Sequence, residues 1–295
     1  MNIWFLSFAD SRLKGPLKRI RRQARAFGFA EERTLIWTEH DLDPDFREKM
    51  KAHLIPGSRG YGYWCWKPQI ILQTLDRMSD GDILLYDDVG CHLNPKGQKR
   101  FEEYVRLANE YGLLAFQSRS PKGTAEPDPR YHFLPEGQWT KGDLLDYFGV
   151  RDNTAVLTSG QIGSGILVMK KCDAIHDLFT RFRAVYFEHF ELCDDTPSRS
   201  PNLPGFQENR HDQSVLSILL KLENRYPTLS SDEYTPCRPF APPEYRNDAS
   251  WGADSFSELA DKPIHAKHDK GGWRSLIPYS VKRLIFKALD ALHHQ

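Results

Sequence analysis

The sequence is poor in the features that mark membrane, disulfide-bonded and nucleic-acid-binding proteins. Its 295 residues contain no apolar run that approaches the roughly 18 residues of a membrane-spanning helix. The five cysteines include no C-x-x-C pair, which argues against a zinc ribbon or a disulfide framework. Lys and Arg number 40 and Asp and Glu number 40, so the formal net charge is zero and we expect no nucleic-acid partner.

Two common nucleotide-binding motifs are missing as well. No G-x-G-x-x-G follows a strand-like run and no Walker A loop is present, so the dinucleotide-binding and P-loop classes lose their main support. The chain starts directly with the apolar run Ile3–Phe8, without a charged leader and a cleavage site. This start predicts a cytoplasmic protein.

Short apolar runs alternate with amphipathic patterns over the first two thirds of the chain. Strands are predicted at Ile3–Phe8, Thr34–Trp37, Ile83–Tyr86, Leu113–Gln117 and Ile166–Met169. Helices are predicted at Pro16–Phe27, from Lys67-Pro68 onward, at 96–110 and at His211–Leu222. Strands and helices in turn predict an α/β fold with a Rossmann-like, mostly parallel central sheet flanked by helices.

The remaining segments predict loops and a tail. Residues 119–139 and 194–209 are rich in Pro, Ser and Gly, which is typical of long surface loops. Residues 226–278 lack periodicity, and we expect them to wrap the core. Residues 280–292 carry one apolar and one basic stripe and predict a C-terminal amphipathic helix. We therefore divide the chain into one domain over 1–278 and a terminal helix over 279–295.

Two acids follow the clearest central strand. Asp87 and Asp88 come directly after Ile83–Tyr86, and ligands of open α/β sheets bind outside the carboxyl ends of the strands. Carboxylate oxygens suit a hard divalent cation, whose charge can stabilise a departing diphosphate. The alternative is that the two acids only begin a turn.

A late segment concentrates cations and imidazoles. His265 and His268 lie among Lys267, Lys270 and glycines in the segment 265–274. Histidine is a ready metal ligand and lysine binds phosphate as a point charge. The alternative is a solvated basic loop.

Further candidates lie in three polar or aromatic stretches. Trp64 and Trp66 follow glycines and can stack on a base or a sugar, although packing in the core is the commoner use of tryptophan. On a helix, Glu208 and Asp212 would share one face at positions i and i+4, and Asp212 also suits a helix N-terminus. Ser159 and Gln161 stand in a glycine-rich segment directly before a predicted strand, which suits a polyhydroxylated substrate or a tight turn. Gln213, directly after Asp212, is the last candidate residue.

The order of these segments along the chain resembles that of the GT-A glycosyltransferases. More narrowly, the chain is similar to bacterial polysaccharide and lipopolysaccharide transferases that carry Gly-Tyr-Trp-x-Trp-Lys-Pro and Tyr-x-Asp-x-Gly-Cys. These motifs stand here at Gly62–Pro68 and Tyr86–Cys91. The late segment is also similar to the His-x-x-Gly-x-x-Lys-Pro-Trp element of glycogenin-like enzymes, and Asp212-Gln213 resembles part of their Asp-Gln-Asp helix.

The resemblance implies a divalent metal, Mn²⁺ or Mg²⁺, at an Asp-x-Asp motif. Asp88 takes the place of the first acid, but Gly90 stands at the place of the second and Asp87 is an extra acid before the motif. Two alternatives follow. Either Asp87 or the pair His265 and His268 completes the metal site, or the diphosphate is held mainly by the cations Lys67, Lys267 and Lys270.

The resemblance also implies a nucleotide-sugar donor, in most cases linked to UDP, bound near Phe8, Ala9 and Asp10. A glycan or lipid-linked glycan would accept the sugar through a hydroxyl, beside Trp64, Trp66, Ser159 and Gln161. Asp212 or Glu208 would serve an inverting enzyme as general base, whereas Gln213 or Asp212 would stabilise the reacting face in a retaining one.

We therefore expect a glycosyltransferase of cell-surface polysaccharide synthesis. The alternatives are a metal-dependent phosphoester hydrolase and a non-catalytic nucleotide- or glycan-binding protein. The basic and apolar stripes of residues 280–292 further predict an association with an anionic membrane surface at the cytoplasmic side. The alternative for this helix is docking on the core.

Overall fold

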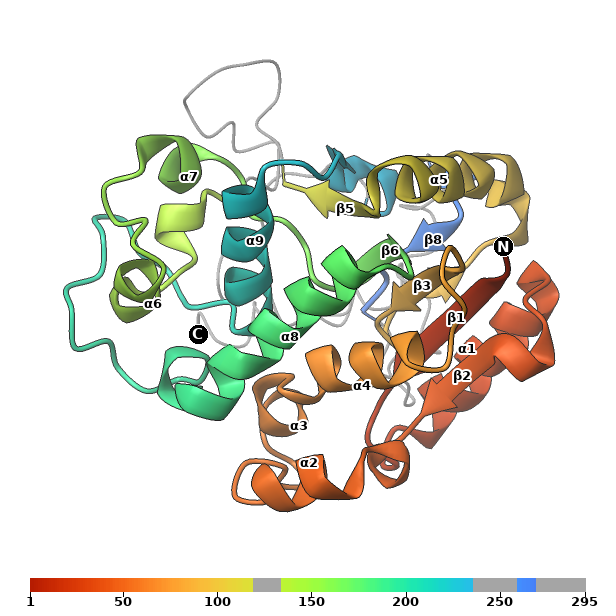
Figure 1. The fold of residues 1–295 in the computed structure, drawn as a ribbon, viewed down its shortest axis with the longest axis horizontal. Helices are drawn as coiled ribbons and strands as arrows, with labels where there is room; N and C mark the ends of the chain where they lie inside the picture. Colours follow the sequence, from red (N-terminus) through yellow and green to blue (C-terminus); the bar gives the residue numbers. More distant parts are fainter. Residues whose placement is uncertain (119–133, 236–258, 269–295) are drawn as a thin grey trace, which may run out of the picture.

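A computed structural model describes residues 1–118, 134–235 and 259–268 (Figure 1). Within them, a central sheet of six strands has the order β2-β1-β3-β6-β5-β7, and β4 and β8 form a separate pair. The strands are β1 (Ile3–Phe8), β2 (Thr34–Trp37), β3 (Ile83–Asp87), β4 (His92–Leu93), β5 (Leu113–Gln117), β6 (Ile166–Lys170), β7 (Thr228–Ser230) and β8 (Ile264–His265).

The central sheet is mixed, with a single reversed strand among the described residues. β1 pairs in parallel with β2 and β3, and β5 pairs in parallel with β7. β6 runs antiparallel between β3 and β5. The predicted α/β fold with a mostly parallel sheet is therefore confirmed. All five residues of β3 are buried, because helices cover both faces of the sheet, and this explains an apolar run without alternation.

Helices α1 and α5 pack on one face of the sheet, and α4, α8 and α9 pack on the other (Figure 1). Alternate residues of β3 serve the two sides: Leu85 contacts the α1 and α5 side, whereas Leu84 and Tyr86 contact the α4, α8 and α9 side. The helices are α1 (Lys14–Phe27), α2 (Pro44–Lys49), α3 (Gly60–Tyr63), α4 (Trp66–Leu75), α5 (Gln98–Tyr111), α6 (Gly142–Tyr147), α7 (Thr154–Thr158), α8 (Asp173–Glu188) and α9 (Asp212–Glu223).

Some segments differ from the prediction. Residues 134–139 were expected in a surface loop, but Glu136 and Trp139 are fully buried against α9 and its neighbours. Part of the stretch 226–278 forms the edge strand β7 rather than a wrapping segment. The predicted helix at 280–292 and the domain boundary at 278 lie outside the described residues.

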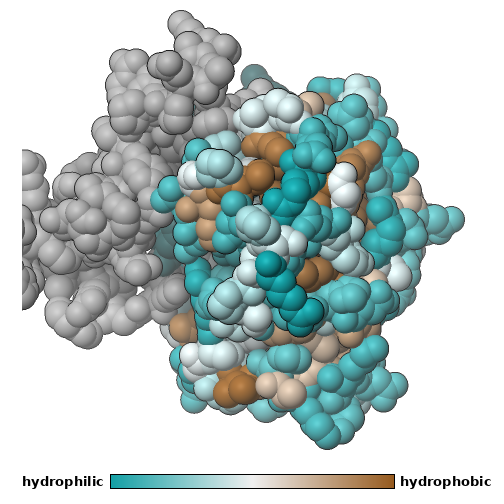
Figure 2. Space-filling model, turned by 90° about the vertical axis from the view of Figure 1, so that its left-hand side faces the viewer, coloured by the Kyte–Doolittle hydropathy of each residue, from teal (hydrophilic) through white to brown (hydrophobic). Residues whose placement is uncertain are grey.

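The surface of the described residues offers no single broad apolar face on the side that carries α6 and α7. Figure 2 shows this side, where brown areas are small and interrupted by teal, hydrophilic residues. No helix among residues 1–118, 134–235 and 259–268 is long and apolar enough to cross a membrane.

Gly97 allows the start of α5 to approach the segment that leads into β8. A Cβ at this position would lie 2.2 Å from the backbone nitrogen of Pro263, which cannot move aside cheaply. We expect Gly97→Ala to destabilise the protein by about 1–3 kcal/mol, the usual cost of overpacking. Gly15, within α1, is the control: a Cβ there meets nothing within 4 Å, and Gly15→Ala should stabilise by about 0.5 kcal/mol. Urea unfolding measures both, and an equal effect of the two substitutions would contradict the close approach.

Candidate functional site

The site is built around Asp88, the first residue after β3. Its backbone nitrogen donates to the carbonyl oxygen of Gly165 at 2.8 Å, and this bond holds the residue against the entry of β6. The phenol of Tyr86 donates to Oδ1 of Asp88 at 2.5 Å. A Cβ on Gly165 would lie 3.0 Å from Oδ2, so glycine leaves room for the carboxylate. The Asp88 side chain keeps 36% of its surface exposed, which leaves it accessible to a ligand.

Lys67 places a buried ammonium between two acids. It is the second residue of α4 and its side chain is 1% exposed. Its Nζ lies 2.5 Å from Oδ2 of Asp212 and 3.4 Å from Oδ1 of Asp88, and it donates to the backbone oxygen and the hydroxyl of Ser164 at 3.2 Å each. Burial lowers the pKa of Lys67, but the two carboxylates more than offset this, so the pKa lies above its usual value.

Asp212 joins the same cluster from the first turn of α9. Its carboxylate is 6% exposed and also accepts a hydrogen bond of 2.7 Å from the hydroxyl of Ser164. A carboxylate at a helix N-terminus is favoured by the helix dipole. The residue before it, His211, has a φ of 54°, an uncommon backbone conformation for a residue with a side chain. α4, α9 and the strand entries before β6 thus converge on one ammonium.

Asp87 does not share the environment of Asp88. It is the last residue of β3, is 0% exposed and pairs in register with Ile166, whose side chain packs on the α1 and α5 side. Successive side chains of a strand point to opposite faces, so the two acids diverge. Burial raises the pKa of Asp87 well above its usual value, which favours the protonated form. The structure therefore separates the two acids, and Asp88 is the one that faces Lys67.

The late segment is joined to the residues that follow β3 through β8, and Ile264 and Ala266, the chain neighbours of His265, pack on the α1 and α5 side. The antiparallel pair of β4 and β8 sets His265 beside His92, four residues after Asp88. His265 is 9% exposed, and its Nε2 lies 2.8 Å from the backbone oxygen of Leu259. Burial lowers its pKa. His268 is exposed and Lys267 half-buried, whereas Lys270 lies outside the described residues.

The predicted metal ligands do not form one centre in the described part of the chain. No three His, Cys, Asp or Glu side chains gather there in a way that could hold a metal ion. Oδ1 of Asp88 already contacts Tyr86 and Lys67, and the side chain of Asp87 is enclosed on the other face of the sheet. A hard divalent cation needs several oxygen ligands, so these side chains alone do not fit it.

The residues predicted to bind the nucleotide and the sugar lie partly in the core. Trp66 is 5% exposed and stacks on Phe8, with the ring centroids 4.1 Å apart. Trp64 is half-buried and stacks on the ring of His211 at 5.7 Å. Ala9 is buried, and Asp10 forms an ion pair with Arg12 at 2.6 Å. The Arg12 guanidinium lowers the pKa of Asp10.

The two predicted polar residues of the strand entry have different surroundings. The hydroxyl of Ser159 donates to the backbone oxygen of Val156 at 2.8 Å, at the end of α7. Gln161 is 1% exposed and donates its side-chain amide into a buried network. Gln213, which is half-buried, donates to Oε1 of Gln161 at 2.6 Å. Gln161 therefore fixes the side-chain amide of Gln213 through this hydrogen bond.

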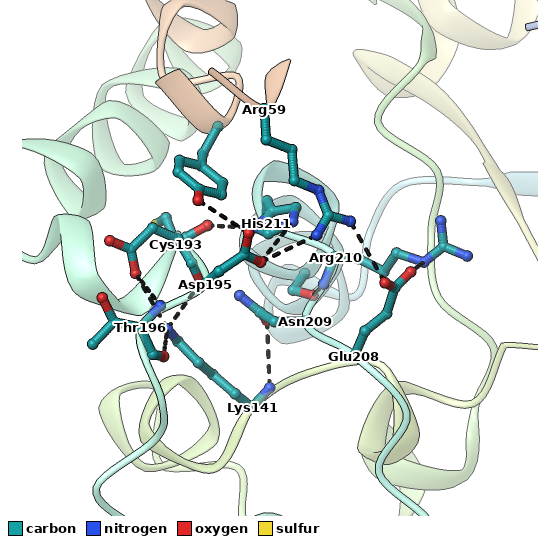
Figure 3. A network of polar contacts seen from close by, with 12 residues as sticks. Arg59, Lys141, Cys193, Asp195, Thr196, Glu208, Asn209, Arg210 and His211 are labelled. Carbon is teal, nitrogen blue, oxygen red and sulfur yellow. Dashed lines mark hydrogen bonds and ion pairs between the residues drawn. The ribbon is translucent and has the colours of Figure 1, made fainter. Parts of the chain in front are cut away.

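A second polar network lies beside Asp212, at the chain before α9 (Figure 3). Arg59 forms ion pairs with Asp195 at 3.1 Å and with Glu208 at 3.5 Å, and Glu208 also lies 3.3 Å from Arg210. Nδ1 of His211 lies 2.7 Å from the backbone oxygen of Cys193, and burial lowers the pKa of this histidine. The predicted general base Glu208 is thus 38% exposed and engaged with two guanidinium groups.

Lys141 holds the loop below this network. Its ammonium, on a side chain that is 4% exposed, donates to the backbone oxygens of Glu191, Asp194 and Thr196 (Figure 3). Burial lowers the pKa of Lys141. The sequence analysis gave Tyr86 and Ser164 no role of their own, although both stand in candidate motifs, and it did not name Lys141. Ser164 carried a signal, because it stands between two glycines directly before a strand, whereas Lys141 carried none.

Comparisons with known proteins find similar structures but no sequence family. No protein-family model matches the sequence, and no curated protein matches it. Three solved structures that match are a glycosyltransferase involved in the glycosylation of the major capsid of PBCV-1, mouse xyloside xylosyltransferase 1, and the galactosyltransferase LgtC in complex with donor and acceptor sugar analogues.

These likenesses are extensive in length and low in identity. The first has 11% identity, a TM-score of 0.46 and covers 94% of this chain and 96% of its own. The xylosyltransferase has 10% identity and a TM-score of 0.46, and the match covers 94% of this chain and 100% of its own. LgtC has 14% identity and a TM-score of 0.45, and the match covers 88% of this chain and 95% of its own. All three are glycosyltransferases by name, the class that the sequence motifs resemble. TM-scores below 0.5 carry no argument about activity, which depends on the site geometry.

Removal of the Lys67 ammonium should be costly, because it would leave two acids without their buried cation. We expect Lys67→Met to lower the free energy of unfolding by about 3–5 kcal/mol. The raised pKa means that the contribution is complete below the unfolded-state pKa of lysine, about 10.4, and is lost as the pH rises through the folded-state value. Chemical denaturation between pH 6 and 9 should therefore give a constant difference.

Two variants control this measurement. Lys51, an exposed partner of Glu48, should lose less than about 1 kcal/mol on replacement by Met. Lys67→Met with Asp212→Leu should recover part of the loss, since both charges are removed together. A loss at Lys67 no larger than that at Lys51 would show that the buried pair does not support the fold.

Proposed function

We propose that this chain is a glycosyltransferase that moves a hexose from a nucleotide diphosphate sugar, UDP-linked, to a hydroxyl of a glycan acceptor in cell-surface polysaccharide synthesis. The observation that carries the proposal is the buried Lys67 ammonium, which holds Asp88 and Asp212 at one site. One acid is accessible and the other enclosed, so the cluster presents Asp88 in a fixed position at the carboxyl end of β3. This is the end of a sheet at which ligands of open α/β folds bind.

The site can supply orientation and charge. Asp88, fixed through Tyr86, Lys67 and the backbone of Gly165, is suited to accept hydrogen bonds from sugar hydroxyls. Fixed polar groups of this kind cost no reorganisation during the reaction. Lys67 itself is enclosed and paired, so in this proposal it positions the acids. The diphosphate is left to the late segment, in which Lys267 and His268 are described.

The acceptor would meet the residues around the start of α9. Glu208 or Asp212 would act as the general base of an inverting enzyme, and Gln213 would lie at the reacting face of a retaining one. Asp212 is held by Lys67 and Ser164, whereas Glu208 is exposed between two arginines. Anomer analysis of the product distinguishes the two stereochemistries, and a loss below tenfold in Asp212→Ala would remove that residue from either role.

Calorimetric titration against a panel of nucleotide sugars, with and without manganese, tests the donor. Turnover with and without a glycan acceptor then separates the alternatives. A transferase needs the acceptor, a phosphoester hydrolase releases sugar or phosphate without it, and a binding protein retains the donor unchanged. Release that is independent of any acceptor would overturn the proposal.

The neighbouring acids Asp87 and Asp88 provide a matched pair of substitutions. We expect Asp88→Asn to lower kcat by about 100-fold or more, because the accessible negative charge is lost. Asp87→Asn should stay within about twofold, because burial already favours the neutral form of this carboxyl and an amide resembles it. Steady-state kinetics with the donor identified by titration measure both, and equal losses would contradict the separate placement of the two acids.

Residues 280–292 are proposed to bind an anionic membrane surface at the cytoplasmic side, on the basis of their sequence pattern. We expect the full chain to float with anionic liposomes and a chain that ends at Pro278 to stay in the soluble fraction. Neutral liposomes are the control. Flotation of both chains to the same extent would assign the contact to another surface.

A further inference from the structure

The side-chain amide of Gln161 has an unusual set of neighbours. Its Nε2 lies within hydrogen-bond distance of Oε1 of Glu136 (2.9 Å), the backbone oxygen of Trp139 (3.0 Å), and the hydroxyls of Thr140 and Ser214 (3.1 Å each). Gln161 is 1% exposed and Glu136 is 0% exposed. The chemistry of these neighbours therefore decides which way the amide points.

All four neighbours can only accept a hydrogen bond from Gln161. A peptide oxygen such as that of Trp139 is an acceptor by nature, and the carboxylate of Glu136 is paired with the ammonium of Lys221 at 2.7 Å. The hydroxyl proton of Thr140 is used on Glu136 at 2.6 Å, and that of Ser214 is used on the Trp139 oxygen at 2.8 Å. The nitrogen of the Gln161 amide, and not its oxygen, must therefore face these four acceptors.

The orientation of Gln161 determines that of Gln213. With its nitrogen turned to Glu136, Gln161 turns Oε1 to Gln213, whose terminal amide atom lies 2.6 Å away. An oxygen can only receive a hydrogen bond there, so the nitrogen of Gln213 faces Gln161. The carbonyl oxygen of Gln213 is then the end left over, and no described residue donates a hydrogen bond to it. The carboxylate of Glu136 thus sets the orientation of the Gln161 amide, which in turn sets the orientation of the Gln213 amide.

We propose that Glu136 and Gln161 are positioning residues that hold Gln213 with its carbonyl oxygen, not its NH₂ group, toward the reacting sugar. The inference rests on the proposed function, in which Gln213 lies at the reacting face beside Asp212. When the bond between the sugar carbon and the diphosphate breaks, the electron pair leaves with the diphosphate and positive charge develops on the sugar. A carbonyl oxygen stabilises that charge or accepts from a sugar hydroxyl, whereas an NH₂ group would oppose it.

Gln161→Met tests the kinetic consequence. Methionine has a similar length but no amide, so Gln213 loses the acceptor that fixes it. We expect kcat to fall about 10- to 100-fold, the range for residues that orient a functional group, while KM for the donor stays within about twofold. The control is Ser217→Ala, which removes a hydroxyl bonded to Glu136 and to the backbone of Ile162 but to neither glutamine. It should lower stability and leave kcat within about twofold.

A second measurement needs no turnover. In the wild-type chain, the side-chain NH₂ protons of Gln213, assigned by NMR through their loss in Gln213→Met, should exchange with solvent at least about tenfold more slowly than those of exposed glutamines. Gln161→Met should abolish this protection and Ser217→Ala should keep it. A wild-type Gln213 amide without protection would overturn the inference even if the chain transfers sugars. Protection without any donor turnover would refute the proposed function and leave the orientation established.

Discussion

The fold and the site depend on one enclosed charge, the ammonium of Lys67. It lies where the end of β3, the entry of β6 and the first turn of α9 meet, and it contacts a group from each of them. One contact alone would not offset the free-energy cost of removing the ammonium from water. Together they offset the free-energy cost of burying the cation, and they connect segments that are distant along the chain. The two acids therefore have fixed positions; they share Lys67 and differ in exposure, their side chains being 36% and 6% exposed.

The buried polar groups around this centre form two separate layers. One layer, around Lys67, contains charges, and the other, around Glu136 and Gln161, passes hydrogen-bond polarity outward to Gln213. The buried side chains Lys67, Asp212, Glu136 and Gln161 of the two layers have partners inside the protein, as buried networks require. A network of this kind specifies one arrangement more strictly than apolar packing does, since each donor excludes the alternatives. Loops around the start of α9 can consequently be irregular while the residues that they carry stay in place.

The sequence predicted the central strands and several helices well, since apolar periodicity reports burial directly. The strand Ile83–Tyr86 is observed as β3 (Ile83–Asp87), and the helix predicted at His211–Leu222 is α9 (Asp212–Glu223). α8 (Asp173–Glu188) was missed, although it packs against α4 and α9 and its buried residues Ile175, Leu178, Phe179, Phe182 and Val185 recur at helical spacing. β7 was missed because its three half-buried residues gain their strand form by pairing with β5.

Chemistry was harder to predict from the sequence than the fold. The glutamine Gln161 was selected for contact with a sugar, but its partners come from residues 136–140 and from α9, which no local pattern connects. Lys67 was selected as a phosphate ligand, whereas two acids from other elements enclose it. In both cases the residue type was informative and its role depended on neighbours brought in by the tertiary fold.

The alternation of burial after β3 sets a limit on how this site could acquire new chemistry. Residues 87, 89 and 91 are buried, whereas Asp88 and Gly90 are partly exposed. Asp87 could not contribute to a designed two-carboxylate centre beside Asp88, because its side chain is buried on the other face of the sheet. The neighbouring exposed position, 90, carries no side chain. The burial of this turn, more than the number of acids in the motif, thus decides which of its residues can reach solvent.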